Sequence, residues 1–286
     1  MEFAGQQFIL YGDEAAWFTV YGIADIHYGN KASAIEQVRE DIEVIRADPW
    51  AFWLGVGDYA EYINHMDPRF DPDCVADDIQ VSDLGRLGAA LTERVATLFR
   101  PIRRKCLGLA FGNHEIKYMR VNTQSDMHAL MCGSLEVPDL GYTGIFDLVF
   151  MHEPGRDVPG LRRAKPDVGA ETWRRRTLVF HGSGYAQTVG GKANKVRAKL
   201  VDVDCDLLFT GHLHDKIASH KVTLQANADC TEPAQREQKG VMCGSYLRTY
   251  APGMTGYGEI KGYAPVPFGP GVARLQPQHR VMRVEV

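Results

Sequence analysis

Residues 206–215 read DLLFTGHLHD, in which an apolar run meets Gly211 and then two histidines separated by one residue. The run has the length of a buried strand, and the glycine with the polar residues after it marks the place where such a strand surfaces. A single histidine at a strand end is more often a hydrogen-bonded structural residue than a ligand. The meaning of this pair therefore depends on what the other strands deliver.

Strands and helices alternate along the rest of the chain. We predict strands at 17–25, 51–58, 106–112, 143–151, 176–182 and 206–212, and helices at 33–49, 84–102 and 192–203. The first helix carries Ser33 and Glu36 in the spacing of a capping box. Residues 7–20 are expected to form a hairpin with its turn near Gly12 and Asp13. This alternation predicts a layered α/β fold with a largely buried sheet.

After residue 215 the sequence pattern changes to short runs of alternating apolar and polar residues, and it predicts no helix. We expect this tail, residues 216–286, to complete a second sheet and to form part of the substrate pocket. The prediction is one domain over residues 1–286, with the chemistry-bearing part at 17–215.

Composition excludes several classes of protein. The 286 residues are 45% hydrophobic with a net charge of −4, which argues against broad electrostatic coating of nucleic acid. Six cysteines without a CxxC pair indicate neither a disulfide framework nor a thiolate zinc site. Without a long apolar run or a signal-peptide pattern, we expect a cytoplasmic protein with no membrane contact and no obligate protein partner.

Metal-binding side chains stand at the ends of five predicted strands, and a glycine adjoins four of these ends. In chain order they are Asp25 and His27, then Asp58, then Asn113 with His114, then His181, and finally His212 and His214. Carboxylates, an amide and imidazoles bind first-row divalent metals. In open α/β sheets, ligands bind beyond the carboxyl ends of the strands. Five such ends in order predict a metal site at one sheet edge.

The series D-x-H, GD, GNHE, H and GHxH resembles the calcineurin-like metallophosphoesterase superfamily over residues 25–214, about two thirds of the chain. The resemblance implies a four-layer α/β/β/α sandwich, in which helices flank two mixed sheets. The tail is similar in character to that of nuclease-like and phage-borne relatives, so we expect a bacterial or phage-encoded protein.

The resemblance also implies roles for the motif residues. One divalent ion would be held by Asp25, His27 and His214, a second by Asn113, His181 and His212, and Asp58 would bridge them. We expect manganese, with iron, zinc, cobalt or nickel as alternatives. Such a pair of ions lowers the pKa of bound water, which provides hydroxide near neutral pH. His114 would protonate the leaving alkoxide as general acid, oriented by the carboxylate of Glu61.

Departures from the family indicate the substrate class. Two positions that hold phosphate-binding arginines in the serine/threonine phosphatase branch are Tyr62 and Phe111 here. Because a monoester dianion needs more positive charge than a diester, we expect a phosphodiesterase on DNA, RNA or a nucleotide. Tyr246 and Arg248 are candidate substrate contacts. A broad-specificity phosphomonoesterase and a non-catalytic scaffold are the alternatives, although the scaffold would be expected to have lost ligands that this sequence keeps.

Overall fold

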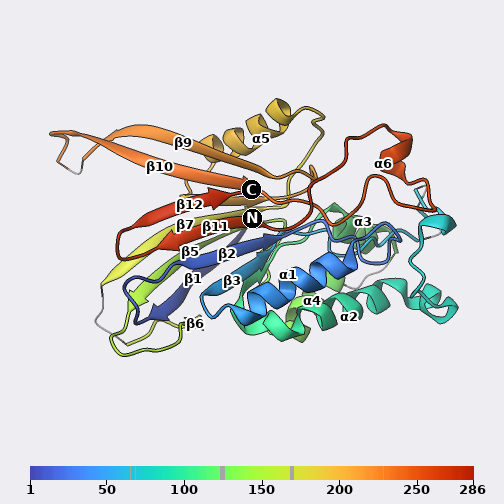
Figure 1. Ribbon diagram of the computed structural model, residues 1–286, viewed down its shortest axis with the longest axis horizontal. Helices are drawn as coiled ribbons and strands as arrows, with labels where there is room; N and C mark the ends of the chain where they lie inside the picture. Colours follow the sequence, from blue (N-terminus) through green and yellow to red (C-terminus); the bar gives the residue numbers. More distant parts are fainter. Residues whose placement is uncertain (65, 68, 123–125, 168–170, 228) are drawn as a thin grey trace.

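The computed structural model describes residues 1–64, 66–67, 69–122, 126–167, 171–227 and 229–286. Its strands form two sheets that lie face to face between helices (Figure 1). The five-stranded sheet has the order β12 (Val281–Glu285), β11 (Gly271–Gln276), β2 (Phe18–Ile23), β3 (Ala51–Gly55) and β4 (Cys106–Leu109). The seven-stranded sheet has the order β6 (Gly160–Arg162), β1 (Glu2–Tyr11), β5 (Thr143–His152), β7 (Thr172–Phe180), β8 (Leu207–Thr210), β10 (Pro233–Met242) and β9 (Ile217–Ala226).

The main core fills the space between the two sheets. Strand β3 shows how alternation divides its side chains, because Phe52 and Leu54 join this core while Trp53 points to the opposite face. Phe209 of β8 meets the same core from the seven-stranded sheet. The period of two places every second side chain of each strand between the sheets.

Helices cover the two outer faces and complete four layers (Figure 1). The outer face of the five-stranded sheet is covered by α1 (Ile35–Ala47), α2 (Leu87–Phe99) and α4 (Met127–Leu135), and α5 (Val189–Asp202) packs on the other sheet. The remaining helices are α3 (Asn113–Asn122) and α6 (Tyr257–Ile260). The predicted sandwich of two mixed sheets flanked by helices is confirmed.

Three local predictions are wrong. Residues 7–20 form no hairpin, because β1 pairs with β5 and β6 whereas β2 pairs with β3 and β11 in the other sheet. The predicted capping box is absent at the start of α1, since the Ser33 hydroxyl donates to the Ile26 carbonyl. The tail contributes strands to both sheets and includes the short helix α6, so it does more than complete one sheet.

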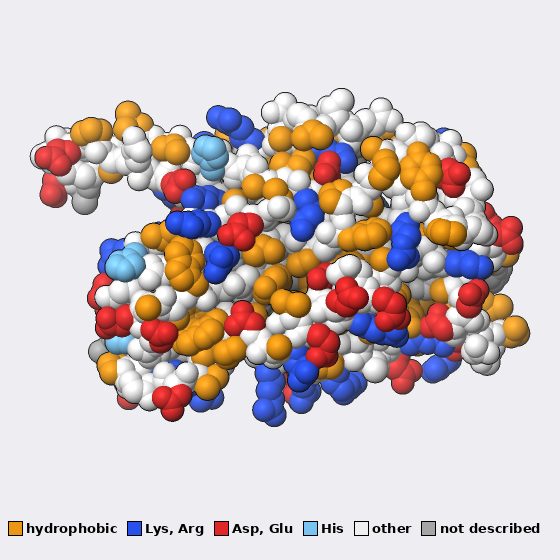
Figure 2. Space-filling view, viewed as in Figure 1, with side chains coloured by type: hydrophobic (Ala, Val, Ile, Leu, Met, Phe, Trp, Pro, Cys, Tyr) orange, Lys and Arg blue, Asp and Glu red, His pale blue; other side chains and the backbone are white. Residues whose placement is uncertain are grey.

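The β9–β10 hairpin extends well beyond the body of the molecule (Figure 2). Strands β2, β3 and β4 are parallel. Their carboxyl ends lie at the opposite end of the sheets and point toward the loop that carries α6 (Figure 1). Within the described residues, no helix is long and apolar enough to cross a bilayer.

Candidate metal centre

The predicted ligands lie in sharp turns directly after the strands. Asp25, His27, Asp58, His212 and His214 all have left-handed backbone conformations, with φ between 48° and 69°. Aspartate and histidine tolerate this region better than most residues with a side chain. The turns bring side chains from β2, β3 and β8 back over one sheet edge.

Glycines make the close approach of these turns feasible. A Cβ atom at Gly112 would lie 2.0 Å from Oδ1 of Asp58, and one at Gly211 would lie 2.7 Å from Oδ2 of Asp25. Any other residue would therefore push a carboxylate out of place. The glycines beside the motif residues thus have a steric role.

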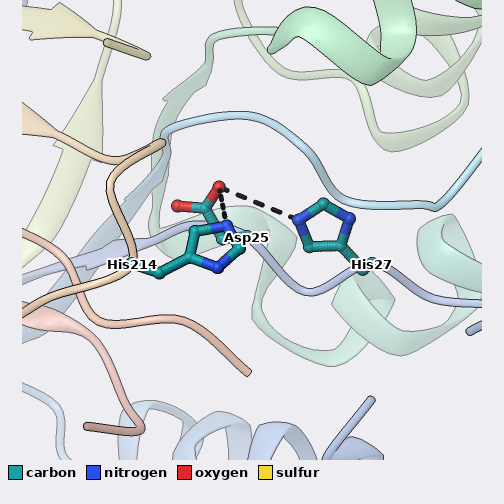
Figure 3. A group of neighbouring side chains, drawn as sticks. All are labelled: Asp25, His27 and His214. Atoms are coloured by element: carbon teal, nitrogen blue, oxygen red, sulfur yellow. Dashed lines mark ion pairs between the residues drawn. The ribbon is translucent and has the colours of Figure 1, made fainter. Parts of the chain in front are cut away.

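Asp25, His27 and His214 form a first group, in which the ligand atoms lie within 4.8 Å of one another (Figure 3). Oδ1 of Asp25 is 3.3 Å from Nε2 of His214 and 4.0 Å from Nε2 of His27. Both Oδ1 of Asp25 and Nε2 of His27 are buried without a hydrogen-bond partner among the described residues. Buried polar atoms are nearly always satisfied, so atoms left open toward one point fit a bound cation.

Asp58, His181 and His212 form a second group of the same size. Nε2 of His181 lies 3.2 Å from Oδ2 of Asp58 and 3.3 Å from Oδ1 of Asn113. The two histidines of GHLH are therefore divided, His212 to this group and His214 to the first. Asp58 also lies within reach of His27, which places its carboxylate between the two groups.

Hydrogen bonds fix the orientation of the imidazoles. Nδ1 of His27 donates to the Glu61 carboxylate at 2.9 Å, and Nδ1 of His181 donates to the Val56 carbonyl at 2.7 Å. A proton held at Nδ1 leaves Nε2 free to act as a ligand, which is the usual arrangement around metal-binding histidines.

Glu61 and His114 are not related as predicted. The carboxylate of Glu61 pairs with His27, whereas Nδ1 of His114 lies 2.5 Å from the backbone carbonyl of Glu61. The main chain, and not the carboxylate, therefore orients His114. The imidazole of His114 is buried and lines the cavity above both groups.

Neighbouring carboxylates raise the pKa values of two histidines in this cluster. Burial by itself lowers the pKa of His27, but the bonded Glu61 carboxylate, together with Asp58 and Asp25, raises it to about 9. Burial likewise acts on His181, and the Asp58 carboxylate outweighs it to raise the pKa to about 10. The buried carboxylates thus favour positive charge at this place, which a divalent cation would supply.

Glu115 is a supporting residue whose role the sequence pattern did not reveal. Its buried carboxylate accepts the backbone N–H groups of Asp58, Tyr59 and Gly112 at 2.8–3.1 Å. One side chain thereby joins the loop that carries Asp58 to Gly112, the residue directly before Asn113. In the sequence, only the position of Glu115 next to His114 in GNHE indicated a place near the site.

A cavity of about 1020 Å³ opens over both groups. Four cations that line it come from separate parts of the chain, and they are Arg69, Lys117, Lys192 and Arg248. Lys117 follows His114 by three residues on α3, so helical spacing could have identified it. Arg69 follows no motif, and its guanidinium is paired with Asp67 at 2.7 Å.

The two predicted substrate contacts have different positions. Arg248 lines the cavity, with its guanidinium 3.3 Å from the Ser33 carbonyl. The prediction that Tyr246 contacts the substrate is wrong, because this side chain is fully buried and its hydroxyl donates to Asp41 at 2.7 Å. Its backbone N–H donates to the Asp25 carbonyl at 2.9 Å, so it supports the centre from below.

Solved structures that align with this chain have low sequence identity to it. A metallophosphoesterase from Sphaerobacter thermophilus is 13% identical, with a TM-score of 0.37 and coverage of 94% of this chain and 89% of that one. A predicted phosphoesterase from Streptococcus pneumoniae is 9% identical, with a TM-score of 0.33 and coverage of 94% and 99%. The Haemophilus influenzae NAD nucleotidase is 11% identical, with a TM-score of 0.41 and coverage of 96% and 50%.

Sequence comparison identifies the family. No curated protein matched the sequence significantly. The calcineurin-like phosphoesterase family matches residues 18–216, which is more than half of the chain and includes every strand end described above. The chain therefore belongs to the calcineurin-like phosphoesterases and is a metal-dependent hydrolase of phosphate esters.

Proposed function

We propose that this phosphoesterase hydrolyses phosphodiesters of nucleic acid or nucleotides. One observation carries the proposal. Two ligand groups lie on either side of Asp58, and the cavity above them is far larger than a phosphate. Such a cavity has room for an organic group on each side of the phosphorus.

The positions that would hold phosphate-binding arginines support a diester substrate. Tyr62 is buried, and its hydroxyl bonds to that of Thr92 at 2.8 Å. Phe111 packs against His128 and Tyr142. Neither side chain can supply positive charge to a phosphate dianion, and a diester carries one negative charge less.

A phosphomonoesterase is the second candidate, and one observation favours it. Arg69 and Lys117 line the same cavity and supply cations from positions outside the family motifs. Since the Arg69 guanidinium is already paired with Asp67, its charge is partly neutralised. For this reason we place the monoesterase second.

The residues of the centre fit a pair of divalent ions, and we propose manganese as the native metal. Asp25, His27 and His214 would hold one ion, Asn113, His181 and His212 the other, and Asp58 both. Bound ions of this kind polarise a phosphoryl oxygen and lower the pKa of a bound water.

His114 is suited to deliver a proton to the leaving oxygen. Its Nδ1 is engaged with the Glu61 carbonyl, so Nε2 is the atom left to exchange a proton in the cavity. Lys117, on the next turn of α3, lies on the same side of the helix and can bind a phosphoryl oxygen. The protein thus provides a proton donor and a cation next to each other.

Glu61→Gln should lower the affinity for metal with little effect on the free energy of unfolding. The amide cannot accept the His27 proton as strongly as the carboxylate does, and loss of such a partner typically costs about 10–100-fold in metal affinity. Competition with a coloured chelator would show one weakened site of two. Glu136→Gln, at an exposed ion pair with Arg103, is the matched control and should bind both ions normally. Equal weakening in the two variants would contradict the role of Glu61.

An activity panel tests the proposed function. With manganese present, we expect faster hydrolysis of bis-p-nitrophenyl phosphate than of p-nitrophenyl phosphate, and loss of both activities with a chelator. Single- and double-stranded DNA then test nucleic acid as substrate. Hydrolysis of the monoester alone would sink the diesterase proposal, and no turnover with any divalent metal would favour the scaffold.

A further inference from the structure

Three tyrosines from two separate segments meet at the wall of the cavity. Tyr185 follows β7, whereas Tyr257 and Tyr263 belong to α6 and the loop after it. The ring centroids of Tyr185 and Tyr263 are 6.0 Å apart, and those of Tyr257 and Tyr263 are 6.1 Å apart. These are ordinary distances for interacting rings, so the three form one aromatic cluster.

The cluster exposes ring surface that the fold does not use. Tyr185 is 59% exposed and Tyr257 is 60% exposed. Figure 2 shows hydrophobic side chains at the surface in the region of α6. An aromatic patch on the wall of a catalytic cavity indicates a ligand group that lies against it.

The main chain links this cluster to the candidate metal centre. Nε2 of His212 lies 3.0 Å from the carbonyl oxygen of Gly184, and Tyr185 is the next residue. The residue that precedes Tyr185 in the chain therefore contacts a side chain of the second ligand group, and both His212 and Tyr185 line the same cavity. The phosphate and the group that meets the tyrosines would belong to the same substrate molecule.

Hydrogen bonds fix the main chain of Tyr263, the residue that contacts both other tyrosines. The backbone N–H of Tyr263 donates to the Gly258 carbonyl at 2.9 Å, and its own carbonyl accepts the Tyr250 hydroxyl at 2.9 Å. A wall fixed in this way loses little conformational freedom on binding.

Charge distinguishes between the groups that bind to aromatic rings. The Lys261 ammonium already lies 5.7 Å from the centroid of the Tyr257 ring. Lys195 lies close by, with its ammonium 3.2 Å from the Ser183 carbonyl. These cations would repel a quaternary ammonium group, whereas a neutral, flat ring can stack on the free tyrosine faces.

We propose that Tyr185, Tyr257 and Tyr263 form a stacking platform for the nucleobase of a nucleoside phosphate ester. The inference rests on the proposed function and names the part of the substrate that gives the site its selectivity. Stacking is tolerant of base identity, so the platform would favour nucleoside esters over small esters without strong preference among bases.

The test compares two diesters that share a leaving group, the p-nitrophenyl ester of thymidine 5′-monophosphate and methyl p-nitrophenyl phosphate. We expect the wild type to prefer the thymidine ester in kcat/KM, and Tyr185→Leu/Tyr263→Leu to reduce that preference by about 10- to 100-fold. Tyr185→Phe/Tyr263→Phe keeps the rings and should keep the preference. Phe3→Leu removes an exposed ring outside the cavity and serves as the matched control.

Two results would overturn the platform, namely equal use of both esters by the wild type and an unchanged preference in the leucine variant. If the wild type hydrolysed neither ester, that result would instead contradict the proposed function. Calorimetric binding then decides the platform alone, since AMP should bind about tenfold more tightly than ribose 5-phosphate to the wild type but not to the leucine variant. Cleavage of oligothymidylate, weakened in the same variant, would assign the base to nucleic acid, and its absence would assign the base to free nucleotides.

Discussion

Asp58→Asn is expected to lower kcat/KM by about 10³-fold or more and to remove both divalent ions. The Asp58 carboxylate belongs to the second ligand group and also lies within reach of His27 in the first. It is the main reason that the pKa of His181 is raised, and it adds to the effect of Glu61 on the pKa of His27. Asparagine keeps the shape but offers one oxygen and no charge. The loss of charge stabilisation of several kcal/mol corresponds to a rate change of this size. Metal content after gel filtration, measured with kcat/KM, checks both parts.

Asp83→Asn is the matched control for this prediction. Asp83 is also a buried carboxylate, but it pairs with Arg94 at 2.8 Å and lies outside the cavity over the ligand groups. We expect both ions and normal activity in this variant. Two tightly held ions in Asp58→Asn would contradict the proposed bridging role.

His114→Asn should slow hydrolysis by about 10²- to 10⁴-fold for esters with poor leaving groups, and much less for p-nitrophenyl esters. A leaving alkoxide of high pKa needs a proton from His114, whereas p-nitrophenolate departs without one. Both ions should remain, because His114 lies outside the two sets of proposed ligands. The measurement is the dependence of kcat on leaving-group pKa, which should steepen in the variant.

His152→Gln tests whether the loss of any histidine has this effect. His152 lies at the end of β5, where its Nε2 bonds to the Gly12 carbonyl at 3.0 Å, and it does not line the cavity. Its leaving-group dependence should match that of the wild type. An equal slowing of good and poor leaving groups in His114→Asn would show that His114 is not the acid.

The ends of the central strands could be predicted because their signals are local. An apolar run followed by glycine and a polar ligand needs no knowledge of distant partners, and GHLH and GNHE both fall where such a run ends. The sheet to which β1 belongs is decided by tertiary pairing. The local pattern at residues 7–20 is equally compatible with a hairpin, and the chain instead crosses from one sheet to the other.

The residues around the ligands were harder to predict because backbone direction decides their contacts. Tyr62 has a φ of 51°, and the turn beside it leaves the Glu61 carboxylate on His27 and only the Glu61 carbonyl on His114. Tyr246 stands in a segment rich in polar residues, yet its bonds to Asp25 and Asp41 hold it in the core. No sequence spacing encodes such long-range contacts.

The left-handed turns that hold Asp25, His27, Asp58, His212 and His214 bear on how the protein can change over evolutionary time. An L-residue in this conformation costs roughly 1–2 kcal/mol, although aspartate and histidine are among the residues that tolerate it best. Replacement by glycine would relieve that strain and abolish a ligand in the same step. Selection for a more stable chain therefore opposes selection for hydrolysis at these five positions, and a descendant released from catalysis would be expected to lose them first.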